Sequence, residues 1–252
     1  MSLLEYNGII NFGFPYEAIY ACLDEAPPLT VVIGAKCSDG VVLIADKKLT
    51  DIFGGKPPEY KHKLSGDLGH FLIGYTGLED VFHIFRKSII GDWLLTLNTE
   101  PYTFNNFITR CCPTIRTLNG IARRPALRVL VAKHQWNDTQ LYYIDDKGID
   151  NKIDDYIAIG SSKGEADNLC KSLSVHDMTM KDFAKHAYFA IMFMNQYHPG
   201  LGVGVEPDGA PGIKYLHYEA EWDKEATPED IKEYKQYTNQ RLEGVRRDLE
   251  VG

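Results

Sequence analysis

Thr30 is the residue whose type and neighbours point most directly to chemistry. It opens the run from Thr30 to Asp46, in which a Ser38-Asp39-Gly40 turn joins two apolar strands. A threonine hydroxyl becomes a useful nucleophile when its own α-amino group, freed by cleavage of the preceding bond, accepts its proton. Thr30 is therefore a candidate nucleophile on condition that the bond after Leu29 is cut.

Three further residues can complete a site around this hydroxyl. An ammonium such as that of Lys63 stabilises the alkoxide, a carboxylate such as Asp46 positions the ammonium, and the Gly77 amide can meet the developing oxyanion. Asp46 and Lys63 also make sense as a structural ion pair, and Thr30 as an ordinary strand residue. The residue types alone leave catalytic and structural interpretations open.

The elements that must position these residues follow from the hydrophobic pattern. Buried strands flank the turn at 38–40, and two further groups of strands are separated by pairs of helices. We expect strands near 70–75, 127–132, 141–144, 156–159 and 213–218, with the middle three as antiparallel hairpin partners. We expect helices near 16–24, 78–97, 103–121, 162–175, 179–197 and 228–249. The last helix carries a narrow apolar stripe, which favours docking on a neighbour.

Composition narrows the class of protein. The chain has 252 residues, a net charge of −8 and a pI near 5.5, which argues against nucleic-acid binding. No apolar run is long enough to span a membrane, and the first residues do not resemble a secretory signal. The five cysteines form no Cys-x-x-Cys pair, so neither a metal site nor a disulfide framework is indicated. We expect a cytoplasmic protein that binds neither metal nor membrane.

Four motifs together resemble the signatures of 20S proteasome subunits, members of the N-terminal-nucleophile (Ntn) hydrolase superfamily. They are the run from Thr30 to Asp46, Lys63-Leu64, Gly74-Tyr75-Thr76-Gly77-Leu78, and Ala158-Ile159-Gly160-Ser161-Ser162-Lys163-Gly164. The motifs are specific as a group and weak singly. The resemblance covers roughly residues 30–220, which leaves 1–29 as an N-terminal extension or propeptide and 221–252 as a charged helical tail.

The resemblance implies a fold, a site and partners. The fold would be α+β, a four-layer αββα sandwich of two antiparallel sheets between helix pairs. Thr30 matches the catalytic threonine, Asp46 and Lys63 the acid and amine beside it, Gly77 the oxyanion amide, and Ser161 a serine that helps hold the site. Ser161 also has a simpler interpretation, as the cap of the helix that follows it. Leu49 and Tyr75 would line the substrate pocket.

The same resemblance implies a homo- or hetero-oligomeric ring of proteasome-type subunits that takes unfolded polypeptides. An ATP-dependent unfoldase or cap is a possible further partner, and no cofactor is implied.

Some residues depart from the catalytic pattern. Leu29 precedes Thr30, where self-processing β subunits of the family usually have glycine. After the fourth core helix, the family's aspartate and serine align with His198 and Leu201 or, after realignment, with Asp208 and Pro211. The long N-terminal segment and the charged helix from Pro228 resemble α subunits, although the usual α-type start does not occur.

Three functions therefore stay open. The first is a threonine endopeptidase that loses residues 1–29. The second is a non-catalytic structural or gating ring subunit that keeps them. The third is an Ntn-fold amidase acting on a small molecule.

Overall fold

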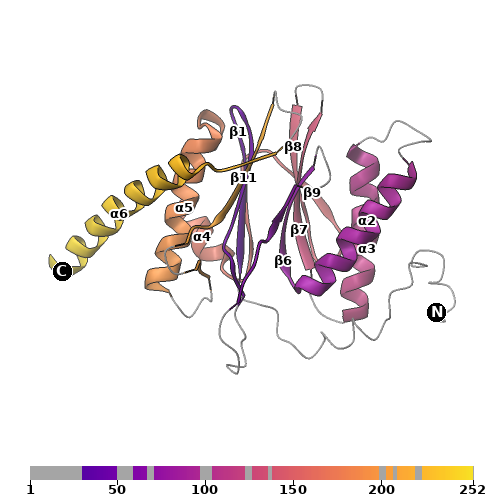
Figure 1. Cartoon of the computed structure of the whole chain (residues 1–252), viewed down its shortest axis with the longest axis horizontal. Helices are drawn as coiled ribbons and strands as arrows, with labels where there is room; N and C mark the ends of the chain where they lie inside the picture. The colour runs from indigo at the N-terminus through magenta and orange to yellow at the C-terminus, as the bar shows by residue number, and fades with distance from the viewer. Residues whose placement is uncertain are drawn as a thin grey trace. The chain divides into compact units, whose positions relative to one another are not determined.

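The computed structural model describes residues 30–49, 59–66, 71–96, 104–122, 127–135, 138–198, 203–206, 209–218 and 223–251. The helix expected at 16–24 lies outside these residues. By its contacts, the chain divides into two compact units. The larger unit contains nearly all of both main sheets and the C-terminal helices (Figure 1). It holds Thr30, Asp46, Lys63 and Ser161, whereas Gly77 belongs to the smaller unit.

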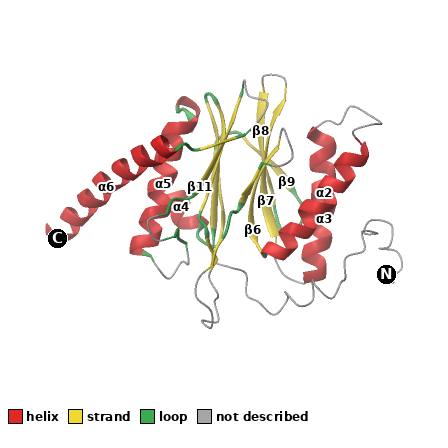
Figure 2. Cartoon of the chain, in the orientation of Figure 1, coloured by secondary structure: helices red, strands yellow, loops and turns green. Residues whose placement is uncertain are grey.

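Two five-stranded sheets form the centre of the larger unit (Figure 2). The first has the strand order β10-β1-β2-β11-β12, with β1 at Val31–Cys37, β2 at Gly40–Ala45, β10 at Tyr156–Gly160, β11 at Gly212–His217 and β12 at Lys224–Glu225. The second has the order β5-β6-β7-β8-β9, with β5 at Leu64–Ser65, β6 at Phe71–Gly77, β7 at Leu127–Gln135, β8 at Asp138–Ile144 and β9 at Asp150–Ile153. A short ribbon pairs β3, Lys48–Leu49, with β4, Glu59–Tyr60.

Strand β1 is apolar except for Lys36, because both of its faces are covered. Val31, Ile33 and Ala35 belong to a core formed with α4 and α5, whereas Val32 belongs to a second core between the two sheets. Gly34 allows close packing in that second core, since a Cβ there would lie 2.9 Å from a methyl of Leu130 in the facing sheet. The hydrophobic run thus fixes a strand buried on both sides.

Three helices complete the larger unit. Helices α4 (Lys163–Cys170) and α5 (Met180–Tyr197) contact the first sheet, with a 3-10 turn at Val175–Asp177 between them. Helix α6, Pro228–Val251, packs on α5. Its Tyr234 is fully buried, and the Tyr234 and Tyr215 hydroxyls lie 2.7 Å apart. The apolar stripe was expected to dock on a neighbour, but its Tyr234 is part of the core of this unit, with Ile231 packed against that core.

The smaller unit contains α2, Glu79–Thr96, and α3, Phe104–Ala122, which contact each other. Asn119 of α3 accepts from the backbone N–H of Leu127 and donates to the carbonyl oxygens of Leu127 and Asp146. This buried amide fixes the end of α3 to two connecting segments. Of the two adjacent cysteines of α3, Cys111 is buried and Cys112 is half-buried.

The predicted fold class, two antiparallel sheets with helix pairs, is confirmed. Two local predictions are wrong. Strand β10 pairs with β1 in the first sheet and does not continue the β7–β8 hairpin, whose sheet is extended instead by β9. The helix expected at 162–175 ends at Cys170.

Candidate active site

Thr30 directly precedes β1, and the registers of the β1–β2 and β1–β10 pairs determine which residues surround it. Val32 is paired with Ala45 between β1 and β2, so Asp46 falls beside Val31 and next to Thr30. Val31 is paired with Gly160 between β1 and β10, so Ser161 falls opposite Thr30. These alignments bring Asp46 and Ser161 next to Thr30, although they are 16 and 131 positions away from it in the sequence.

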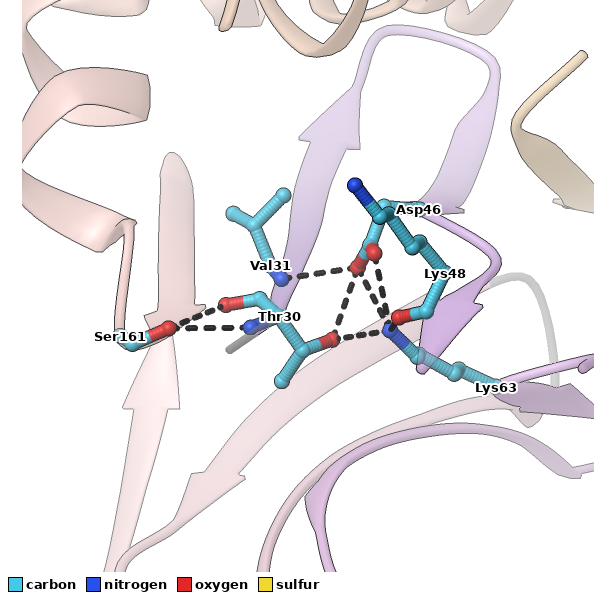
Figure 3. A network of polar contacts seen from close by, with 6 residues as sticks. All are labelled: Thr30, Val31, Asp46, Lys48, Lys63 and Ser161. Atoms are coloured by element: carbon cyan, nitrogen blue, oxygen red, sulfur yellow. Dashed lines mark hydrogen bonds and ion pairs between the residues drawn. The ribbon is translucent and has the colours of Figure 1, made fainter. Parts of the chain in front are cut away.

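The Thr30 hydroxyl lies between an ammonium and a carboxylate (Figure 3). Lys63 Nζ donates to Thr30 Oγ1 at 2.5 Å, and Thr30 Oγ1 donates to Asp46 Oδ1 at 2.7 Å. Lys63 Nζ also lies 2.9 Å from both carboxylate oxygens of Asp46. The threonine, aspartate and lysine are 2%, 0% and 2% exposed, so these charged groups interact away from bulk water.

Backbone groups complete the surroundings of this pair. The Lys48 carbonyl accepts a hydrogen bond from Lys63 Nζ at 2.8 Å, and the Val31 N–H donates to Asp46 Oδ1 at 2.9 Å. An ammonium has three N–H donors, so Thr30, Asp46 and Lys48 account for all those of Lys63. We call Thr30, Val31, Asp46, Lys48, Lys63 and Ser161 the Thr30 network.

Burial lowers the pKa of Lys63, because removal from water disfavours the ammonium, while the charge of Asp46 and its hydrogen bond oppose this effect. The charged form has an acceptor for each of its N–H groups, which is the arrangement that a buried ammonium requires. Lys63 can therefore stabilise negative charge that develops on Thr30 Oγ1.

Ser161 binds both backbone groups of Thr30. Its Oγ accepts from the Thr30 N–H at 2.9 Å and donates to the Thr30 carbonyl at 3.3 Å (Figure 3). The preceding Gly160 has φ +109°, and a Cβ on it would lie 2.2 Å from the Thr30 carbonyl oxygen. The interpretation of Ser161 as a helix cap is wrong, because the N-cap residue of α4 is Ser162.

The segment after Asp46 is held by the segment that follows α5 in the sequence. The Gly204 carbonyl accepts from the Lys47 N–H at 2.9 Å and from the Lys48 N–H at 3.1 Å. Lys48 is thus fixed through its amide while its carbonyl holds Lys63.

The other predicted residues lie on neighbouring strands. Leu49 is in β3 opposite Glu59. Tyr75 is buried in β6, and its N–H donates to the Lys63 carbonyl at 3.1 Å. Gly77 ends β6 with φ +125°. Among the predicted site residues, side-chain hydrogen bonds join Thr30, Asp46, Lys63 and Ser161, and a backbone hydrogen bond joins Tyr75 to Lys63.

Of the residues aligned with the family's later aspartate and serine, the structure describes His198 and Pro211. His198 is the C-cap of α5, where its N–H donates to the Met194 carbonyl. Pro211 is buried and lines a pocket described below. Leu201 and Asp208 lie outside the described residues.

No group of three or more His, Cys, Asp or Glu side chains among the described residues is arranged to hold a metal ion. No described helix is long and apolar enough to cross a membrane.

Residues 30–196 match the proteasome subunit family, and the chain belongs to that family. This match confirms the resemblance derived from the four motifs. No curated protein matches the chain. Among solved structures, the chain is similar to a mutant of Anbu from Hyphomicrobium sp. strain MC1, with a TM-score of 0.68 and 14% sequence identity. The alignment covers 88% of this chain and 96% of that one, and it supports the proteasome-type Ntn-hydrolase fold.

Proposed function

We propose that this chain is a threonine-type endopeptidase subunit in which Thr30 becomes the nucleophile once residues 1–29 are removed. The observation that carries the proposal is the position of Thr30 Oγ1 between Lys63 Nζ and Asp46 Oδ1. A hydroxyl held against a buried ammonium is prepared to become an alkoxide, which is the activation that threonine needs.

Each residue of the site has a defined task in this reaction. The free Thr30 amine takes the proton from Oγ1, and Oγ1 attacks the peptide carbonyl. The peptide C–N bond breaks, the leaving amine receives that proton, and an ester to Thr30 remains. Water then adds to the ester and releases the acid product, returning the hydroxyl.

The charged groups assist these reaction steps from the positions that they occupy in the structure. The ammonium of Lys63 stabilises the alkoxide, and Asp46 orients that ammonium through contacts of 2.9 Å. Ser161 orients the Thr30 nitrogen. We assign the oxyanion donor to the Gly77 N–H and the substrate pocket to Leu49 and Tyr75, as the family resemblance implies.

The wider proposal concerns the assembly. Proteasome subunits form rings, and we propose that this chain assembles with proteasome-type subunits in the cytoplasm to degrade unfolded polypeptides, with an ATP-dependent unfoldase or cap as partner. Residues 1–29 would form the removable extension, 30–220 the Ntn domain and 221–252 a helical tail.

A non-catalytic ring subunit is the second candidate, and one observation favours it. In the intact chain the Thr30 nitrogen is a peptide amide, and the Lys63 ammonium is saturated by three acceptors. A buried ion pair whose N–H donors all have acceptors, such as Lys63–Asp46, is also suited to a purely structural role.

Intact-mass measurement with a threonine-directed electrophile tests the proposal. We expect the purified chain to lose residues 1–29 and to gain one adduct, mapped to Thr30. Thr30→Ser keeps the hydroxyl and should keep labelling, whereas Thr30→Ala should abolish it. A folded, full-length chain that assembles but never reacts would favour the non-catalytic subunit. Hydrolysis of a small-molecule amide in the absence of peptidase activity would favour the amidase.

A further inference from the structure

A pocket of ≈150 Å³ lies against the Asp46–Lys63 pair and has no established ligand. Its walls come from the end of β2, from the residues around β5, from β11 and β12, and from the start of α6. Neither Thr30 nor Tyr75 is among the described residues that line it, so we treat it as separate from the side on which we place the substrate. A cavity of about this volume accommodates a benzene-sized molecule.

The lining has an apolar part and a charged part. Apolar contacts come from Ala45, Leu64, Ile213, Ala226 and Ile231. The titratable side chains of the lining are Lys47, His62, Lys63, Lys214, Asp46 and Glu225, which are four basic and two acidic groups. The chemistry of the pocket therefore suits a compact apolar group that carries an acidic function.

Both acidic groups of the lining face lysines. Asp46 is paired with Lys63 at 2.9 Å, and Glu225 lies 3.4 Å from Lys214, which also contacts Asp223 at 2.7 Å. Two further basic groups, Lys47 and His62, line the pocket, and Asp46 and Glu225 are the carboxylates among its described lining residues. Since the Lys63 donors are already used within the Thr30 network, Lys47 is the cation best suited to receive an anionic ligand.

We propose that this pocket binds a small monocarboxylate with an apolar body of about the size of a benzene ring. The carboxylate pairs with Lys47 beside His62, and the apolar body packs on Ile213, Ala226 and Ile231. Because Asp46 and Lys63 form part of the same walls, occupancy places a negative charge next to the Thr30 network. The site does not depend on whether Thr30 acts as a nucleophile.

Ligand-observed fluorine NMR on the full-length chain tests the proposal with three probes of matched shape. These are 4-fluorobenzoate, neutral 4-fluorobenzyl alcohol and cationic 4-fluorobenzylamine. We expect the benzoate to bind at least about fivefold more tightly than the alcohol, with the preference falling as salt is added. Binding is measured without substrate turnover, so failure of this proposal and failure of the peptidase proposal are distinguishable.

Two substitutions locate the binding. Ala226→Leu fills the apolar end and should weaken all probes at least about tenfold. Lys47→Gln should remove only the preference for benzoate, whereas Lys171→Gln, at an exposed lysine beyond α4, should change nothing. Equal binding of the three probes, or benzoate binding unaffected by Lys47→Gln, would overturn the proposal. If Ala226→Leu does not fold, Lys47→Gln and the salt series decide.

Discussion

Neutralising Asp46 should destabilise the protein far more than an ordinary surface substitution. Asp46→Asn keeps an oxygen that can accept from Val31 N–H and Thr30 Oγ1, but it leaves the Lys63 ammonium uncompensated at 2% exposure. Removing one partner of a buried ion pair costs about 3–5 kcal/mol. For a chain of this size, that corresponds to a fall in melting temperature of about 6–20 °C.

A double-mutant cycle separates this charge effect from local packing. Lys63→Met in the Asp46→Asn background removes the stranded ammonium, so the double variant should recover at least about 2 kcal/mol relative to Asp46→Asn alone. The matched control is the exposed pair Lys152–Asp154, whose charged atoms lie 4.0 Å apart. Its coupling energy should stay within about 0.5 kcal/mol of zero. Urea midpoints followed by circular dichroism supply all the free-energy differences.

The pH dependence of Asp46→Asn provides an independent check. Burial lowers the pKa of Lys63 below its usual value of 10.5, and loss of the Asp46 charge lowers it further. Between the folded and unfolded pKa values, the unfolded chain binds more protons, so stability rises with pH. The deficit of Asp46→Asn should therefore shrink as the pH rises toward 10.5. A double variant no more stable than Asp46→Asn, or a deficit independent of pH, would refute the reasoning.

Three further substitutions, one of them a control, test other parts of the fold. Gly160→Ala should cost about 1–3 kcal/mol and reduce labelling at Thr30, because φ is +109° and the new Cβ meets the Thr30 carbonyl. Gly164→Ala in α4, with nothing within 4 Å of its Cβ, should be neutral or stabilising in the same melts. Asp230→Asn should cost about 1–2 kcal/mol at neutral pH. Burial opposes ionisation of Asp230, but hydrogen bonds from Lys181 and Thr227 outweigh it and lower its pKa from 3.8. The contribution is present above pH 3.8 and disappears as pH falls through the lowered pKa, so the two proteins should converge in acid.

The buried strands could be predicted from the sequence because their apolar runs are long and bounded by turns. Two edge strands, β9 and β12, could not. Strand β9, Asp150–Ile153, is mostly exposed, and β12 is the dipeptide Lys224–Glu225, so neither carries a hydrophobic pattern. Strand β10 was expected in the wrong sheet because local pattern does not encode which distant strand it pairs with.

The side chains of the Thr30 network could be predicted as a set from the family motifs, but its backbone members could not. The Lys48 carbonyl and the Val31 amide take part through their main-chain position, which any residue type would supply. The exchange of hydrogen bonds between Ser161 and both backbone groups of Thr30 likewise depends on the β1–β10 register.

The Tyr215–Tyr234 hydroxyl contact joins α6 to strand β11 of the first sheet at 2.7 Å. In hydrogen-exchange terms, the first half of α6 then belongs to the same cooperative foldon as the sheet, because its amides open only when this buried contact breaks. The far end of α6 has no such anchor in β11. Protection should therefore decline along the helix, and a fusion at the C-terminus should be tolerated more readily than truncation at Pro228.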